Sequence, residues 1–248
     1  MIPKSYNSAF FNEQLSFSDE SAATVLSLVT GWINPKSIVD VGCGMGIWLS
    51  NALRLGIRDI TGIDGSYVPA DKLLIDKEQF VVADLENEIP RLRKYDLAIC
   101  LEVAEHLTPG RAKSFIEDLC ALSDVILFSA AIKGQEGTLH INEQYPAYWL
   151  DFFAMNDYEC VDCLRPAIWD NKKIQFWYKQ NSLLFIRREK MPLFTSLKEL
   201  PSFHAKNIVH PELFDYKTGR LNYHSSLIAN PAKLMRHYLS NIYHRKKK

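Results

Sequence analysis

Short apolar runs alternate with longer mixed stretches between residues 37 and 131, and this alternation is the main structural signal of the chain. The runs occupy residues 37–41, 59–65, 79–85, 95–102 and 124–131. Each run has the length of a buried strand, and most of the stretches between them can hold a helix. Strands that alternate with helices form a parallel sheet covered by helices. The pattern therefore predicts an α/β domain, with a helix at 145–156 and further strands at 158–164 and 182–188.

The segments on either side of this pattern have a different character. Residues 1–36 predict a helical cover, in which Ser18 or Asp19 caps a helix that runs to about Thr30. Beyond the last strand, residues 190–248 form a basic extension that prolines interrupt. We therefore divide the chain into a cover, a central domain at 37–189 and this extension.

Part of the extension has the pattern of an amphipathic helix. Residues 232–244 place Leu234, Tyr238 and Ile242 on one helical face, beside basic residues. A helix of this kind binds an anionic surface, or it packs on its own domain or on a second subunit. We favour packing.

A glycine-rich turn follows the first strand. Gly42, Gly44 and Gly46 alternate with other residues at the end of the strand, and Asp40 lies within it. Glycine leaves no side chain between the backbone and a ligand, and the N-terminus of the next helix points its N–H groups at the same place. The turn therefore predicts a nucleotide-type cofactor site. Its G-x-G-x-G spacing differs from the G-x-G-x-x-G of dinucleotide folds, which argues against a nicotinamide oxidoreductase.

Two later strands also end in a carboxylate. Asp64, which Gly65 follows, lies about 20 residues beyond the glycines, where it can accept hydrogen bonds from two ribose hydroxyls. Asp84 ends the third strand and can receive an adenine amino group, with Leu85 against the ring. Because parallel strands end at one edge of a sheet, these residues predict a single cofactor site.

Four motifs together resemble those of class I S-adenosylmethionine-dependent methyltransferases: VDVGCGMG, GIDG, VVADL and DLAICLEVAEHL, in that order. The resemblance covers about residues 37–131 and extends weakly to 188. It implies a Rossmann-like, seven-stranded and mostly parallel sheet with helices on both faces, in which the last two strands pair as a hairpin and one strand is antiparallel. A later segment, FSAAIKGQEGTLHINEQ, resembles a bacterial subgroup associated with surface-glycan biosynthesis.

The resemblance also assigns cofactor roles. The three glycines would admit the amino-acid end of S-adenosylmethionine, Asp64 its ribose and Asp84 its adenine. The full set of expected cofactor-binding residues is Asp40, Gly42, Gly44, Gly46, Trp48, Asp64, Gly65, Asp84, Leu85, Leu101 and Glu102. Within this set, Trp48 either covers the cofactor or packs the first helix against the sheet.

The catalytic residues should lie after the fourth strand, where this fold holds the methyl group. Glu102, Glu105 and His106 would share one face if a helix begins there, and His140 comes from the loop after the fifth strand. In one hypothesis His140 is a general base, with Glu102 and His106 beside it. In a second hypothesis all four side chains bind one Mn²⁺ or Mg²⁺, as E-x-x-E-H resembles the metal site of small-RNA terminal-ribose methyltransferases. In a third, Glu102 and His106 only line or brace the cofactor pocket.

An aromatic group in the second half of the chain suggests a pocket for a carbohydrate or nucleotide ring, or else core packing. It comprises Tyr145, Tyr148, Trp149, Trp169, Trp177 and Tyr178, with the polar Arg165, Gln180 and Asn181 nearby. Together with the two resemblances and the acidic character of residues 1–189, this group predicts O-methylation of a small sugar, nucleotide-linked or phosphoryl-type metabolite in bacterial surface polysaccharide or capsule synthesis. The alternatives are a metal-dependent ribose 2′-O-methyltransferase acting on RNA and a non-catalytic cofactor-binding partner subunit.

Composition limits the partners. The net charge is zero, so the basic extension leaves residues 1–189 acidic, which argues against a nucleic-acid partner. Five cysteines lack disulfide spacing and suggest a reducing compartment. Cys160 and Cys163 would face opposite sides of a strand, which argues against zinc. We see no signal peptide and no apolar run that spans a membrane, and we expect a cytoplasmic protein of undetermined oligomeric state.

Overall fold

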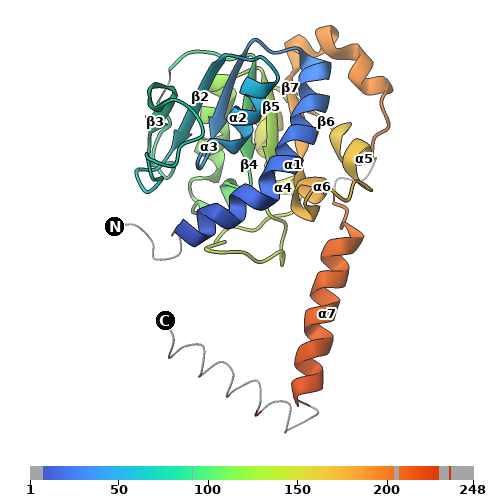
Figure 1. Cartoon of the computed structure of the whole chain (residues 1–248). Coiled ribbons are helices and arrows are strands. Elements are labelled where there is room, and N and C mark those ends of the chain that lie inside the picture. The colour runs from blue at the N-terminus through green and yellow to red at the C-terminus, as the bar shows by residue number, and fades with distance from the viewer. Residues whose placement is uncertain (1–7, 91, 204–206, 229–234, 236–248) are drawn as a thin grey trace. The chain divides into compact units, whose positions relative to one another are not determined.

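A computed structural model describes residues 8–90, 92–203, 207–228 and 235 of the protein (Figure 1). The chain divides into two compact units, Met1–Ile208 and Val209–Lys248. Within the described residues, none of the helices combines the length and the apolar character needed to cross a bilayer. The unit Met1–Ile208 contains the sheet and the candidate site.

A seven-stranded sheet forms the centre of this unit, in the order β3-β2-β1-β4-β5-β7-β6. The strands are β1 (Ser37–Val41), β2 (Asp59–Asp64), β3 (Phe80–Val82), β4 (Leu97–Leu101), β5 (Val125–Ser129), β6 (Tyr158–Val161) and β7 (Leu183–Arg187). Parallel pairing joins β3 through β5, whereas β7 pairs antiparallel with both β5 and β6. This topology confirms the predicted Rossmann-like, mostly parallel sheet.

Helices cover both faces of the sheet, which explains why its central strands are mostly apolar. Every residue of β1, β4 and β5 is buried. Alternate residues enter opposite layers: Ile38 packs with α1 (Ser8–Ile33) and α2 (Ile47–Arg54), whereas Val39 packs with α3 (Ala112–Leu122) and α4 (Pro146–Met155). Strands buried on both faces read as continuous apolar runs, and this is why the sequence located them.

The first helix begins earlier than predicted. It starts at Ser8 and passes through Ser18 and Asp19, so neither residue caps it. The Asp19 carboxylate instead accepts hydrogen bonds from Asn51 Nδ2 at 2.9 Å and Arg54 Nη1 at 2.8 Å, both on α2. The capping pattern in the sequence therefore reflects a tertiary contact between two helices.

The region between the last two strands also differs from a simple hairpin. Two short helices, α5 (Leu164–Ile168) and α6 (Phe176–Asn181), lie between β6 and β7 in the chain. Cys163 follows the end of β6 and precedes α5, so the expectation that it lies within a strand is wrong. None of the five cysteines forms a disulfide in the described part of the chain.

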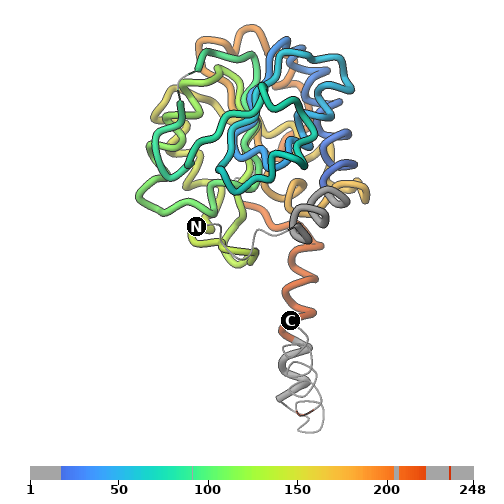
Figure 2. Tube along the Cα trace, turned by 60° about the vertical axis from the view of Figure 1, so that its left-hand side comes forward, coloured from blue at the N-terminus to red at the C-terminus, as the bar shows by residue number. Residues whose placement is uncertain are grey.

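Short 3₁₀ segments and one further helix complete the described chain. They are η1 (Lys77–Gln79), η2 (Ala104–His106), η3 (Arg188–Glu199) and α7 (Pro211–Ile228), of which α7 belongs to the unit Val209–Lys248. The helix predicted over residues 232–244 lies outside the described residues apart from position 235. In both views the yellow-green chain between β5 and α4 forms a loop at the edge of the domain (Figure 1, Figure 2).

Candidate active site

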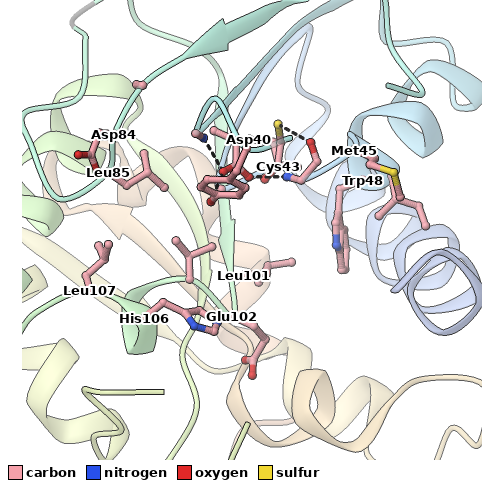
Figure 3. A pocket seen from close by; sticks show the side chains of 18 of the residues that line it. Asp40, Cys43, Met45, Trp48, Asp84, Leu85, Leu101, Glu102, His106 and Leu107 are labelled. Atoms are coloured by element: carbon pink, nitrogen blue, oxygen red, sulfur yellow. Dashed lines mark hydrogen bonds between the residues drawn. The ribbon is translucent and has the colours of Figure 1, made fainter. Parts of the chain in front are cut away.

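A pocket of about 660 Å³ lies at the carboxyl ends of the parallel strands, within the size range of small-molecule sites. It gathers most of the residues expected at the site: Asp40, Gly42, Gly44, Trp48, Asp64, Gly65, Asp84, Leu85, Leu101, Glu102 and His106. Asp84 and Leu85 lie toward one end, Trp48 lies toward the other, and Glu102 and His106 lie on a third side (Figure 3). Gly46, Glu105 and His140 are outside the pocket lining.

The glycines of the turn make room for the protein's own side chains as well as for a ligand. Gly42 has φ 79°, and a Cβ at this position would collide with Val103. Gly46 has φ 83°, and a Cβ there would lie 3.2 Å from Ile75. Both conformations favour glycine, so the turn depends on these residues for its backbone path.

Asp64 is tied into the turn that surrounds it. Its carboxylate accepts the N–H of Gly44 at 2.6 Å, the N–H of Gly65 at 2.6 Å and the hydroxyl of Tyr67 at 2.5 Å. Burial raises the pKa of Asp64, and these hydrogen bonds oppose the shift. Tyr67 also lines the pocket, and the sequence motifs gave no signal for it.

Asp40 contributes an acceptor that the protein leaves unsatisfied. The residue is 2% exposed, and its Oδ2 atom has no hydrogen-bond partner in the described part of the chain. Burial and the neighbouring charge of Asp64 raise its pKa well above the ordinary value. A buried acceptor without a donor is costly, and a ligand with an ammonium group would supply the donor.

A buried arginine, Arg111, holds the end of the pocket that contains Asp84 and Leu85 (Figure 3). Arg111 donates from Nε to the carbonyl of Leu85 at 3.0 Å and from Nη2 to the carbonyl of Asn87 at 2.6 Å. The same guanidinium forms a buried ion pair with Asp118. The turn that carries the exposed Asp84 and the buried Leu85 is therefore fixed in place. No motif in the sequence pointed to Arg111.

The segment after β4 does not form the helix on which Glu102, Glu105 and His106 would share one face, so the condition for that arrangement is not met. Glu102 has φ 55°, in the left-handed region, and only the single turn η2 follows it. Its carboxylate accepts hydrogen bonds from Gln135 Nε2 at 2.9 Å and Asn181 Nδ2 at 3.0 Å. Glu102 is consequently directed toward α6 and the loop after β5.

Glu105, His106 and His140 nevertheless converge. One ligand atom from each residue lies within 4.8 Å of the others, and His140 Nε2 is 4.0 Å from Glu105 Oε1. Glu105 is fully buried, and neither carboxyl oxygen has a hydrogen-bond partner among the described residues. Burial and the charge of Glu102 raise the pKa of Glu105 well above its usual range. Burial, then the charge of His140, lowers the pKa of His106 to about 4.

The predicted aromatic group is divided between the pocket and the core. Tyr178 lines the pocket and meets Trp48 edge-on, with ring centroids 5.2 Å apart. Trp149 is instead 2% exposed and packs on Phe128 in the core. These residues therefore do not form one carbohydrate platform, although Trp48 and Tyr178 present aromatic surface to the pocket.

Residues 17–129 match a family model described as a methyltransferase domain. The match contains the glycine turn, Asp64, Asp84 and the segment from Glu102 to His106. The match covers a little under half of the chain, so this region is similar to a methyltransferase domain. The match begins within α1, so the family region includes part of the predicted cover.

The chain is similar to known O-methyltransferases over part of their length. A ubiquinone biosynthesis O-methyltransferase of Acinetobacter baylyi is 34% identical over 85 residues, which are 31% of this chain and 35% of the relative. One from Neisseria meningitidis serogroup C is 27% identical over 141 residues, 53% of this chain and 59% of the relative. The chain thus spans about one third to three fifths of these two relatives.

A solved structure shares the fold. An O-methyltransferase family protein from Burkholderia thailandensis superposes with a TM-score of 0.54 and 13% identity, over 73% of this chain and 58% of that one. At this identity the likeness shows the fold alone. Together with the sheet order and the family match, it identifies the fold of class I methyltransferases.

Proposed function

We propose that the protein is an S-adenosylmethionine-dependent methyltransferase that methylates an oxygen of a small-molecule acceptor. The observation that carries this proposal is the pocket of the methyltransferase domain, in which the glycine turn, Asp40 and Asp64 converge. The relatives described above are O-methyltransferases by name, which supports oxygen as the methylated atom. The division of the chain into three segments, 1–36, 37–189 and 190–248, is part of this proposal.

The polar groups of the pocket fit this cofactor. The unpartnered Oδ2 of Asp40 suits the α-ammonium group of the amino-acid end. Asp64 suits the ribose hydroxyls, and Leu85 with Asp84 suits the adenine. When bound, the cofactor supplies a methyl group on a positively charged sulfur. The acidic residues around the turn complement that charge.

The transfer requires an acceptor oxygen that is aligned with the methyl group and has lost its proton. Glu102 and His106 line the pocket, and His140 lies next to His106, with ring centroids 4.8 Å apart. His140 is the proposed general base. Glu102 is held by Gln135 and Asn181, so we assign it to positioning the acceptor rather than to accepting its proton.

A divalent cation is the second way to activate the acceptor. The two orphaned oxygens of Glu105 and the unpartnered Nδ1 of His106 fit a cation held with His140. A mixed set of imidazole and carboxylate ligands favours Mn²⁺ over Mg²⁺. Glu102 lies outside this group and would not be a ligand in the observed conformation. A bound cation there would lower the pKa of an acceptor hydroxyl.

The acceptor class remains the most specific part of the proposal. We propose a carbohydrate-type or nucleotide-linked metabolite, supported by the aromatic surfaces of Trp48 and Tyr178 and by the second motif resemblance. An RNA acceptor is the second candidate, because three of the four side chains that the resemblance to small-RNA enzymes implies, Glu105, His106 and His140, converge. Five cysteines without a disulfide among the described residues support a reducing compartment such as the cytoplasm.

Transfer of labelled methyl from S-adenosylmethionine into a cell extract tests this function. The extract is separated into small-molecule and RNA fractions, and each reaction is run with EDTA or with added Mn²⁺. We expect label in small molecules with the wild type and none with Asp64→Ala. Loss of label with EDTA and recovery with Mn²⁺ would assign the activity to a cation. Label confined to RNA would overturn the acceptor class, and no label in either fraction would argue against catalysis.

A further inference from the structure

The loop between β5 and α4 folds around one carboxylate, that of Glu143. Its Oε2 accepts the N–H of Gly134 at 2.8 Å, and its Oε1 accepts the N–H of Glu136 at 2.6 Å. The same Oε1 lies 2.9 Å from Nδ1 of His140. The side chain of Glu143 is 16% exposed, and its contact with His140 is partly buried, whereas the two contacts with backbone N–H groups are exposed. The loop therefore has an internal anchor.

The contact with Glu143 determines which ring nitrogen of His140 carries the hydrogen. A carboxylate without a proton is only an acceptor, so the Nδ1 atom facing it must be the donor. In a neutral imidazole the other nitrogen, Nε2, then has the free lone pair. Nε2 is the atom that lies 4.0 Å from Glu105.

The backbone on the other side of His140 is fixed as well. The N–H groups of Ile141 and Asn142 both donate to the carbonyl of Glu105, each at 2.9 Å. The His140 ring also meets the His106 ring at an interplanar angle of 86°. The loop thus holds the His140 imidazole at Nδ1, and the backbone that directly follows His140 is hydrogen-bonded to η2.

We infer that Glu143 is a positioning residue that holds His140 as the Nδ1–H tautomer and directs its Nε2 toward Glu105 and His106. A histidine that serves as a base or as a metal ligand commonly has its other nitrogen held by a carboxylate in this way. The catalytic consequence of this inference rests on the proposed function. The tautomer itself does not, because it is a property of the folded chain.

The alternative is a purely structural role, in which Glu143 only organises the loop. Its bonds to Gly134 and Glu136 would then be sufficient, and the tautomer of His140 would be indifferent to the charge of residue 143. Glu143→Gln separates the two roles. It keeps the length of the side chain and one carbonyl acceptor, but its amide can either donate to Nδ1 or accept from it.

Nitrogen NMR of histidine-labelled apoprotein tests the inference without cofactor or acceptor. In alkaline buffer, where imidazoles are neutral, we expect His140 of the wild type to show a protonated Nδ1 and an unprotonated Nε2. In Glu143→Gln the tautomer ratio should shift by about tenfold toward Nε2–H, because a charge-assisted hydrogen bond is lost. The matched control is Glu136→Gln, an exposed glutamate of the same loop, which should leave the ratio unchanged.

Each outcome is decisive. A wild-type His140 that carries its hydrogen on Nε2 overturns the inference, and so does an unchanged ratio in Glu143→Gln. If Glu143→Gln does not fold, the wild-type spectrum alone still decides the tautomer. With an acceptor in hand, Glu143→Gln should lower kcat while the Kd for S-adenosylmethionine is unchanged. A correct tautomer without any methyl transfer would contradict the proposed function and leave the inference intact.

Discussion

At the scale of single residues, two buried carboxylates line the pocket. Asp40 and Asp64 are 2% and 3% exposed, and burial, then the charge of Asp64, raises the pKa of Asp40. Asp64 is stabilised by three donors, whereas Asp40 retains an unpartnered oxygen. The apoprotein therefore keeps an electrostatic cost that a cationic ligand would relieve.

Burying the charged form of Asp40 costs free energy, so Asp40→Asn should gain stability in a pH-dependent way. Because the pKa of Asp40 is raised above 3.8 in the folded state, the folded chain retains a proton that the unfolded chain releases. Folding stability is therefore lost as the pH rises from 3.8 through the folded pKa. Asp40→Asn should be more stable than the wild type to urea near neutral pH, with no gain at pH values below 3.8, and should bind S-adenosylmethionine more weakly. Lower stability of the variant at neutral pH would contradict this explanation.

Tyr67 predicts a competition at Asp64. A carboxylate has about four lone-pair sites, and three are already used, one of them by the Tyr67 hydroxyl. Two ribose hydroxyls need two sites, so Tyr67 must release Asp64 when the cofactor binds. Tyr67→Phe should therefore bind S-adenosylmethionine about tenfold more tightly by calorimetry. An analogue with a single ribose hydroxyl serves as control, because it should gain much less. Weaker binding of the natural cofactor to Tyr67→Phe would show that the hydroxyl helps binding.

At the scale of elements, the turn after β3 depends on the start of α3. Arg111 connects the two through the carbonyls of Leu85 and Asn87, and Asp118 neutralises its charge. Asp118 also accepts the N–H of Ile89 at 3.1 Å. One ion pair thus fixes the end of the pocket that we assign to adenine.

Replacement of Arg111 should lower the free energy of unfolding. Arg111→Met leaves the Asp118 carboxylate buried without its partner and should lower the free energy of unfolding by about 3–5 kcal/mol. The double variant Arg111→Met/Asp118→Leu should recover a large part of this loss. Urea unfolding of the single and double variants gives the comparison. Equal stability of Arg111→Met and the wild type would show that the pair has no structural role.

The elements that the sequence located correctly are those whose signal is burial. β1, β4 and β5 are mostly apolar because helices cover both faces, and their residues were read directly from the chain. The start of α1 was missed because the polar side chain of Asp19 bonds α2 rather than its own backbone. A local pattern cannot show with which distant element a polar side chain pairs.

The candidate site was predictable to a similar degree. Asp64 and the glycines were located because their spacing follows the strand ends. The left-handed backbone of Glu102, and its bonds to Gln135 and Asn181, depend on tertiary contacts and left no motif. Tyr67, Arg111 and Glu143 were missed for the same reason. They act on the predicted residues from other segments or through loop geometry.

At the scale of the whole molecule, the burial of the cysteines predicts a simple thiol reactivity. Burial raises the pKa of Cys120 and of Cys163 to about 12, and it raises the pKa of Cys43 and Cys100 well above the ordinary value. Cys160 is the half-buried member of the five. Near pH 8, a thiol reagent should modify Cys160 rapidly in the native protein and all five cysteines after denaturation. Rapid modification of several native thiols would contradict the described packing.

Equilibrium binding of S-adenosylmethionine is the most direct test of the central claim. Calorimetric titration of the wild type should show one site in the pocket. Asp64→Ala should bind about 10- to 100-fold more weakly, because hydrogen bonds to a charged acceptor are lost. His140→Ala should bind as the wild type does but should not transfer the methyl group. Absence of binding to the wild type, or an equal loss of affinity in both variants, would contradict the account.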